Sequence, residues 1–186
     1  MITDSQYEKS ALLIGCDVPA VKAVAEVESK GSGFLSNGDV MILFEPHIFY
    51  GELKLKGITP TVSDICYEKW GTKPYGKYSE QWPKLNRAIQ IDETAALKSA
   101  SYGKFQILGK YYYECGCKDV QEFVAAMKKD ESEHLRLFTN LIISRGLQQA
   151  LKKLDWVAFA KAYNGAGYAK NQYDIKLAKA YQKYNT

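Results

Sequence analysis

Apolar residues recur every three or four positions along most of this chain, which is the spacing of amphipathic helices. Two short helices are predicted near the start, over 4–14 and 17–29. Asp17 offers an N-cap for the second helix, and Pro19 falls in its first turn, where a missing N–H costs nothing. Further helices are predicted over 46–56, 79–98, 104–114, 119–129, 131–144, 147–153, 155–164 and 173–184.

A short β-hairpin is expected to interrupt this helical pattern. The segment GFLSNGDVMILFEP contains Asn37-Gly38, a dipeptide that favours a tight turn because both positions need positive φ. Two short strands are predicted beside it, over 34–35 and 40–44. Residues 57–78 are rich in Gly, Pro, Tyr and Thr and predict an ordered surface loop. The pattern as a whole predicts a mainly helical α+β protein with a small β-hairpin.

Composition agrees with a folded, water-exposed protein. Of 186 residues, 46% are hydrophobic and 25% charged, so disorder is not expected and residues 1–186 suit one domain. No apolar run reaches the ~20 residues that span a bilayer. The beginning, MITDSQYEKS, lacks the basic and then apolar pattern of a classical signal peptide. If the protein acts outside the cytoplasm, another route is expected to deliver it.

The cysteine pattern predicts reduced thiols and no metal. Cys115 and Cys117 are one residue apart, which would strain a bridge between them, and the remaining two (Cys16 and Cys66) form no disulfide framework. Paired C-x-x-C knuckles, the usual sign of a zinc site, are missing. No metal and no cofactor are therefore expected.

Positive charge is concentrated towards the C-terminus. The formal net charge is +4, but residues 145–186 alone carry eight Lys or Arg against Asp155 and Asp174. This asymmetry suggests a polyanionic partner, either nucleic acid or an anionic cell envelope. The last helix, 173–184, places lysines beside tyrosines, which indicates either a helix packed on the domain or a basic surface that contacts an anionic envelope.

Two glutamates of the helix over 17–29 have different surroundings. At about 100° per residue, Glu28 extends an apolar stripe formed by Val21, Val24 and Ala25. Glu26 lies on another face, four residues from Lys22 and from Lys30, as in a solvated ion-paired surface. A carboxyl group among apolar neighbours has a raised pKa, which a general acid needs near neutral pH. Periodicity alone leaves open whether Glu28 faces such a site or solvent.

Three short motifs bear on this alternative. Glu28-Ser29 is followed closely by glycine, SASYGKFQI covers 99–107, and AYNGAGYA covers 162–169. In this order they resemble the signatures of goose-type lysozymes and lytic transglycosylases. In those proteins the second motif is a small-residue turn leading into G-x-x-Q-I at the start of a helix.

A closer resemblance extends over nearly the whole chain. The combination of AEVES-x-G-x-GF, a hairpin, ILFEPHIFY, SEQWPKLNRA and SYGKFQILG is similar to the phage-type N-acetylmuramidase family, which supplies the catalytic domain of endolysins. The resemblance implies a lysozyme-like fold with a small β-hairpin lobe. It also implies cleavage of the β-1,4 bond between N-acetylmuramic acid and N-acetylglucosamine in peptidoglycan.

The resemblance implies a role for each of several residues. Glu28 would donate a proton to the departing oxygen, and Glu45, just after the second hairpin strand, would be the second carboxylate of a glycosidase pair. His47 would order the turn at Glu45 by a hydrogen bond and lie beside the substrate. If Glu45 has no catalytic role, it is instead a structural carboxylate that pairs with a helix terminus.

The resemblance also implies a set of substrate contacts. In the second motif, Ser101 and Tyr102 would approach the sugar, and Gln106 would hydrogen-bond the substrate or frame the acid. In the third motif, the Tyr163 hydroxyl would approach Glu28, and Asn164 would end its helix sharply beside the site. Aromatic faces suit sugar rings, and two tyrosines of the 57–78 loop, Tyr75 and Tyr78, are the expected groove members. His134 is expected on a solvated face.

Two other functions remain open at this stage. A lytic transglycosylase shares the three short motifs but lets the muramic 6-hydroxyl attack in place of water, which leaves 1,6-anhydro ends. A non-catalytic module could keep the groove only to bind glycan. Nucleic-acid binding rests on charge alone and is not expected. The resemblance favours a monomer made in a bacterial cytoplasm that acts on the cell wall in the periplasm.

Overall fold

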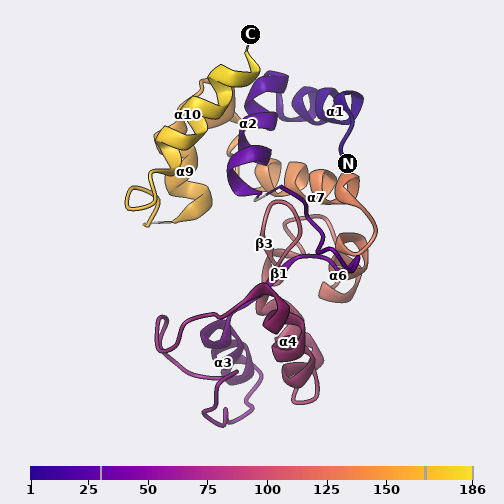
Figure 1. The fold of residues 1–186 in the computed structure, drawn as a ribbon, viewed down its shortest axis with the longest axis vertical. Coiled ribbons are helices and arrows are strands. Elements are labelled where there is room, and N and C mark those ends of the chain that lie inside the picture. Colours follow the sequence, from indigo (N-terminus) through magenta and orange to yellow (C-terminus); the bar gives the residue numbers. More distant parts are fainter. Residues whose placement is uncertain (30, 166, 186) are drawn as a thin grey trace.

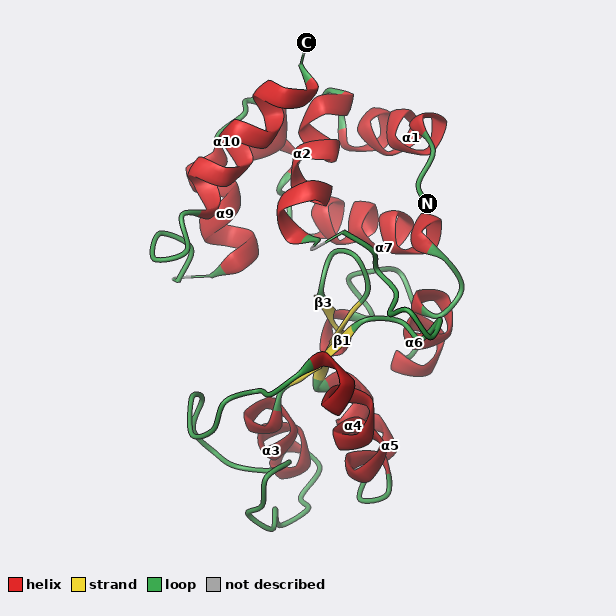
Figure 2. Cartoon of the chain, viewed as in Figure 1, coloured by secondary structure: helices red, strands yellow, loops and turns green. Residues whose placement is uncertain are grey.

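A computed structural model describes residues 1–29, 31–165 and 167–185. Within them the chain is mainly helical, with one small antiparallel sheet (Figure 2). The helices are α1 Asp4–Ile14, α2 Val18–Glu28, α3 Pro46–Leu55, α4 Gln81–Ile89, α5 Glu93–Lys98, α6 Val120–Met127, α7 Glu131–Ser144, α8 Gln148–Lys152, α9 Trp156–Asn164 and α10 Tyr173–Tyr184, with short 3-10 turns at Tyr78–Glu80 and Gly109–Tyr111. The strands are β1 Ile42–Phe44, β2 Ala100–Tyr102 and β3 Ile107–Leu108.

The elements are divided between two ends of an elongated molecule (Figure 1). Helices α1, α2, α7, α9 and α10 lie at one end, and α3, α4 and α5 lie at the other with the loop over 57–77. The sheet and α6 lie between them. Helix α10, far from α2 in sequence, packs along α2 and α9. None of the helices within the described residues is both long and apolar enough to span a membrane.

The first two helices begin as the sequence predicts. The Asp17 side chain accepts a hydrogen bond from the Ala20 amide at 2.9 Å and caps α2. Helix α2 then ends at Glu28, because Ser29 is already extended at φ −105° and ψ 135°. The Ser29 hydroxyl donates to the Ala25 carbonyl at 2.5 Å, and the Ser29 amide donates to the same carbonyl at 3.2 Å.

The predicted hairpin is only partly correct. Asn37-Gly38 does turn the chain, but only Gly38, at φ +88°, has the positive φ expected of both residues. The segments beside the turn share a single bridge, between Phe34 and Val40. Strand β1 pairs with β2, and β2 pairs with β3. This pairing places Ile42 and Phe44 beside Tyr102 and Ala100, and all four side chains are buried. Burial of this shared apolar face explains why β1 pairs with a distant segment.

Two predicted helices are wrong. The helix expected over 104–114 is absent because Gln106 lies at φ +47°, outside the right-handed helical region, and β3 follows. The long helix over 79–98 is divided into a 3-10 turn, α4 and α5. Asp92 starts α5 anew by accepting a hydrogen bond from the Ala95 amide at 2.8 Å.

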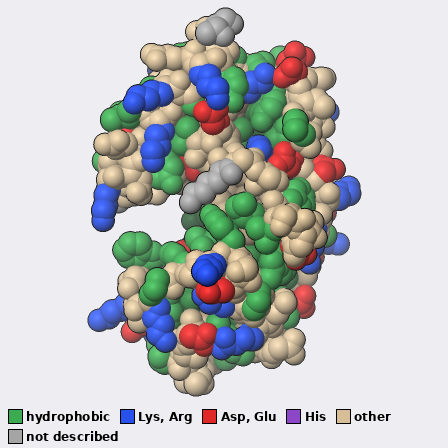
Figure 3. Space-filling model, in the orientation of Figure 1, with side chains coloured by type: hydrophobic (Ala, Val, Ile, Leu, Met, Phe, Trp, Pro, Cys, Tyr) green, Lys and Arg blue, Asp and Glu red, His purple; other side chains and the backbone are tan. Residues whose placement is uncertain are grey.

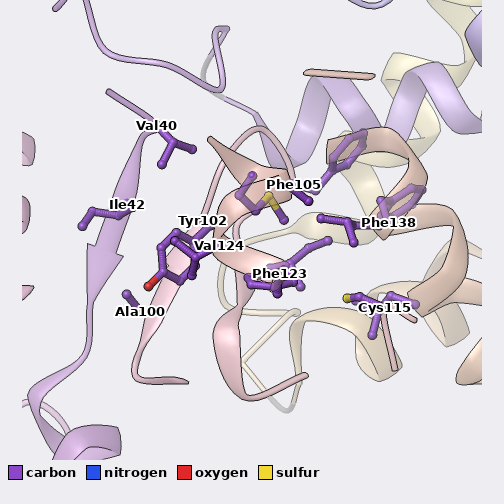
Figure 4. Close-up of a cluster of buried hydrophobic side chains, with 14 of the residues drawn as sticks. Val40, Ile42, Ala100, Tyr102, Phe105, Cys115, Phe123, Val124 and Phe138 are labelled. Carbon is purple, nitrogen blue, oxygen red and sulfur yellow. The ribbon is translucent and has the colours of Figure 1, made fainter. Parts of the chain in front are cut away.

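The core is continuous from the sheet to α7 (Figure 4). Phe105 stacks on Phe138 with ring centroids 4.4 Å apart, and Tyr102 meets Phe123 edge to face at 5.6 Å. These rings join the motif over 99–107 to α6 and α7. The sheet is therefore held against the helical end by aromatic packing.

His134 is part of this core, and the expected solvated face is wrong. Its side chain is fully buried and stacks on Phe34 at 5.1 Å. Its Nδ1 accepts from the Lys104 amide at 3.1 Å, which leaves Nε2–H to donate to the Met127 carbonyl at 2.6 Å. Periodicity missed this position because neighbouring charges on α7 suggested a polar face.

The imidazole is in close contact with two glycines. A Cβ at Gly33 would lie 2.6 Å from it and a Cβ at Gly103 2.7 Å from it. Nearby, Oε1 of Glu131 accepts from the Gly33 amide at 2.8 Å. The first turns of α7 therefore fix both the segment that follows α2 and the turn between β2 and β3.

Candidate active site

Glu28 is the last residue of α2 and is only partly accessible to solvent. Its Oε1 accepts a hydrogen bond from Nδ2 of Asn164 at 2.9 Å. Burial raises the pKa of Glu28 from 4.5 to about 7, although the Asn164 hydrogen bond and the positive charge of Lys176 both act to lower it. Because burial dominates, this carboxyl group holds its proton close to neutral pH.

Asn164 is placed beside Glu28 by the end of α9. Gly165 follows it at φ +77° and ψ −169°, a conformation that L side chains rarely adopt, so glycine allows the helix to stop there. The side-chain amide of Asn164 donates a hydrogen bond through Nδ2 but accepts none through Oδ1. This oxygen is buried, and no group in the described part of the chain donates to it. An unused acceptor therefore lies next to the Glu28 carboxyl.

Tyr163 supports this arrangement from the core side. Its ring stacks on Phe159 at 5.4 Å and meets Phe138 edge to face at 5.9 Å. Its hydroxyl donates to the Phe105 carbonyl at 3.1 Å. Burial and then the charge of Glu28 raise the pKa of Tyr163, so the two groups are near one another. The motif predicted this proximity, but the hydroxyl bonds the backbone of the 99–107 motif.

Glu45 lies at the junction of β1 and α3, with its amide donating to the Ser99 carbonyl at 2.8 Å. Its side chain is 19% exposed. Oε2 accepts from the Tyr75 hydroxyl at 3.3 Å, and Oε1 accepts from the Ser101 hydroxyl at 3.4 Å. Groups from the loop and from β2 thus hold both oxygens of this carboxylate.

His47 approaches Glu45 without the hydrogen bond that the sequence suggested. Its Nε2 lies 3.7 Å from Oε2 of Glu45, which is beyond hydrogen-bond distance. Its Nδ1 is buried, and no partner for it lies among the described residues. Burial lowers the pKa of His47 despite the nearby charge of Glu45, so the imidazole is neutral near pH 7.

The expected sugar contact of Tyr102 is wrong. Its side chain is fully buried, and its hydroxyl donates to the Leu97 carbonyl at 3.0 Å. Successive side chains of a strand point to opposite faces of the sheet. Since Ser101 points towards Glu45, Tyr102 points into the core. Gln106 also has a local partner, because its Nε2 donates to the Gly103 carbonyl at 2.9 Å and closes the turn after β2.

The two carboxylates belong to elements at opposite ends of the molecule. Glu28 ends α2 at the end formed with α9 and α10, and Glu45 precedes α3 at the other end (Figure 1). Figure 3 shows a hollow between these two ends. The structure therefore groups Glu28 with Tyr163 and Asn164 at one end, and Glu45 with His47 and Ser101 at the other.

The loop over 57–77 adds aromatic groups to the Glu45 side. Tyr75 bonds Glu45 directly, and burial raises the pKa of Tyr75 to about 12, so it stays a neutral donor. Trp70, which the sequence did not single out, is 73% exposed and hydrogen-bonds Tyr75. By contrast, Trp82 donates to the Val40 carbonyl at 2.9 Å and Trp156 packs on Tyr181. A tryptophan in a Gly- and Pro-rich loop was the sequence signal that could have found Trp70.

The surface charge of Glu26 is confirmed, but its partners differ from those expected. Glu26 is exposed and accepts from Lys183 at 2.7 Å and from the Tyr184 hydroxyl at 2.6 Å. Lys22 pairs with Asp4 instead, and Lys30 lies outside the described residues. Glu26 therefore attaches α10 to α2.

A carboxyl group that keeps its proton close to neutral pH is in the state that a general acid requires. Residues 17–185 match the profile of the muramidase family, described as N-acetylmuramidase. The chain belongs to this family and is a peptidoglycan-degrading enzyme.

The solved crystal structure of the endolysin of Burkholderia phage AP3 is also similar to this chain. It is 38% identical, with a TM-score of 0.91, and the match covers 99% of this chain and 70% of that one. No curated protein matches the sequence.

Proposed function

We propose that this enzyme hydrolyses the β-1,4 bond between N-acetylmuramic acid and N-acetylglucosamine, with Glu28 as general acid. The observation that carries the proposal is the raised pKa of Glu28, about 7, at the C-terminal end of α2 beside Asn164. A carboxyl group in this state can donate its proton to the departing glycosidic oxygen. Exposed carboxylates, by contrast, are ionised and cannot act as acids near neutral pH.

Asn164 determines which oxygen of Glu28 carries that proton. Its Nδ2–H donates to Oε1, so the proton of neutral Glu28 resides on Oε2, which makes no such bond. The adjacent Oδ1 of Asn164 is an acceptor without a donor among the described residues. Because Oδ1 is buried, the contribution of Asn164 is the hydrogen bond that orients the acid.

Glu45 is proposed as the second carboxylate. As the glycosidic bond breaks, positive charge develops at the sugar C1, and a second carboxylate stabilises it or takes a proton from the attacking water. Water then adds to C1 and gives up a proton, to Glu45 if Glu45 acts as the base and otherwise to Glu28. Exchange with solvent leaves Glu28 protonated and Glu45 ionised for the next cycle. The hydrogen bonds from Tyr75 and Ser101 fix Glu45 in one orientation for this role.

Substitution of the acid tests the proposal directly. Glu28→Gln keeps the volume of the side chain and its acceptor for Asn164 but removes the proton, so we expect release of soluble muropeptides to fall at least ~100-fold. Glu8→Gln, an exposed position on α1, is the matched control and should keep wild-type activity. Wild-type release by the Glu28→Gln variant would refute the role of Glu28.

The chemistry of the products distinguishes hydrolysis from transglycosylation. Mass spectrometry of digested peptidoglycan should show muramic ends that have gained water. If 1,6-anhydro-muramic ends, each lighter by one water, dominate the products, the enzyme is a lytic transglycosylase and not a hydrolase. The second carboxylate at Glu45 favours hydrolysis, since the transglycosylase reaction uses one glutamate.

The place of action follows from the same proposal. The similar structure is that of a phage endolysin. We infer that this enzyme is likewise made in a bacterial host cytoplasm and acts as a monomer on the cell wall in the periplasm. Expression of the chain in bacteria, with and without a permeabilised inner membrane, tests this: lysis should require the permeabilised membrane.

A further inference from the structure

A groove between α2 and α10 opens beside the Glu28 end of α2. It has a volume of about 530 Å³ and is lined by Glu26 and Val27 of α2 and by Lys176, Lys179, Ala180 and Lys183 of α10. Val27 directly precedes Glu28, and a helix rises only ~1.5 Å per residue. This α2–α10 groove therefore begins within one helical turn of the proposed acid.

The positive charges in the α2–α10 groove are not all neutralised. Lys183 is paired with Glu26 at 2.7 Å. Lys176 lies over the Tyr173 ring at 5.4 Å, and both Lys176 and Lys179 are exposed. Neither has a carboxylate within 4.0 Å among the residues that the structure describes. Two positive charges can therefore reach a ligand in this groove.

These charges extend to the surroundings of Glu28. The charge of Lys176 is near enough to Glu28 to act on its carboxyl group, and the Glu28 charge in turn acts on the Tyr173 hydroxyl. Figure 3 shows lysine and arginine side chains on the face over α9 and α10, down to the edge of the hollow. A ligand that lies at Glu28 would therefore meet these lysines.

We propose that the α2–α10 groove binds the carboxylates of the peptide attached to muramic acid, through Lys176 and Lys179. The inference rests on the proposed function, because a muramic residue reaches this groove only when its glycan lies beside Glu28. The amino-sugar backbone of peptidoglycan is neutral apart from this substituent, whereas the attached peptide carries several carboxylates. Charge complementarity therefore selects the peptide. Val27 and Ala180 add a small apolar lining that suits short peptide side chains.

The test compares two soluble glycan substrates. Glycan oligomers that keep their peptides are assayed beside the same oligomers after an amidase has removed the peptides. The readout is the ratio of kcat/KM for the peptide-bearing substrate to kcat/KM for the peptide-free one. This ratio cancels any effect of Lys176 on Glu28, because the same acid cleaves both substrates. The variant is Lys176→Gln/Lys179→Gln, at fixed pH and ionic strength.

We expect the wild-type enzyme to prefer the peptide-bearing substrate. An exposed ion pair contributes a factor of roughly two to five, so loss of two should lower the ratio about 4- to 25-fold. The matched control, Lys152→Gln/Lys153→Gln, removes the same charge from exposed positions at the end of α8 and should keep the wild-type ratio.

The possible outcomes separate this inference from the function on which it rests. An unchanged ratio in an active Lys176→Gln/Lys179→Gln variant would refute peptide binding in the α2–α10 groove and would leave the proposed muramidase function intact. An equal fall in the control would mean general attraction to anionic polymers, which also refutes it. A wild-type enzyme inactive on both substrates would contradict the muramidase function, and this inference with it.

Discussion

Replacement of Glu28 by glutamine should stabilise the protein, and only above acidic pH. The pKa of Glu28 is raised by burial to about 7 in the folded protein, against 4.5 for an ordinary glutamate. Below about pH 4.5 Glu28 is protonated in both the folded and the unfolded state, so it does not lower the free energy of unfolding. As pH rises towards 7, the unfolded chain releases the proton while the folded one keeps it, so the folded state loses stability. Above about pH 7 the loss is complete.

The size of this effect follows from the difference in pKa. At about 1.4 kcal/mol for each pKa unit, a rise from 4.5 to about 7 corresponds to about 3.5 kcal/mol. Glu28 keeps some contact with solvent, so a measured value of about 2 to 3 kcal/mol is expected. Glutamine has nearly the same shape and keeps an oxygen for Asn164, so it removes the charge with little other change.

Urea unfolding at about pH 4 and about pH 8.5 measures the effect. The free energy of unfolding of Glu28→Gln minus that of the wild type should be near zero at the lower pH and reach about 2 to 3 kcal/mol at the higher one. Titrations of other groups cancel in this difference. Glu8→Gln should show no such pH dependence, since Glu8 is exposed. An equal difference at both pH values would refute a raised pKa at Glu28.

Two further predictions concern the contacts that hold the site. Gly33→Ala should lower the free energy of unfolding by about 1 to 3 kcal/mol, because the new Cβ would lie 2.6 Å from His134. The control is Gly51→Ala within α3, where nothing lies within 4 Å of the new Cβ, and it should stabilise the protein by about 0.5 to 1 kcal/mol. Urea unfolding measures both variants, and equal effects would argue against a tight contact at Gly33. Tyr102→Phe should lower the free energy of unfolding by about 1 to 3 kcal/mol, because the Leu97 carbonyl loses its donor. The kcat/KM of this variant should be unchanged, and a selective rise in KM would show that Tyr102 does contact the sugar.

Much of the helical architecture could be predicted from local sequence. The predicted bounds of α1, α7 and α10 agree with the structure. Helix α7, for example, combines a periodic apolar stripe with Asp130, whose side chain caps its start. The family was also predictable, because the order of several short motifs is a property of sequence alone.

The sheet and the environment of His134 could not be predicted in this way. The Asn37-Gly38 turn is correct, yet β1 pairs with β2, nearly sixty residues away, because their apolar faces bury one another. Polar neighbours on α7 hid the burial of His134, which depends on two glycines from distant segments.

For the candidate site, local sequence set Glu28 apart at the end of an apolar stripe. The resemblance to the family, and no local pattern, singled out Glu45. The surroundings of each residue came from the folding of distant segments onto one another. Folding turned Ser101 towards Glu45 and Tyr102 into the core, and it brought Asn164 and Lys176 beside Glu28. The pKa of a carboxyl group depends on its burial and on nearby charges. For Glu28 those neighbours lie more than a hundred residues away along the chain, which local periodicity does not register.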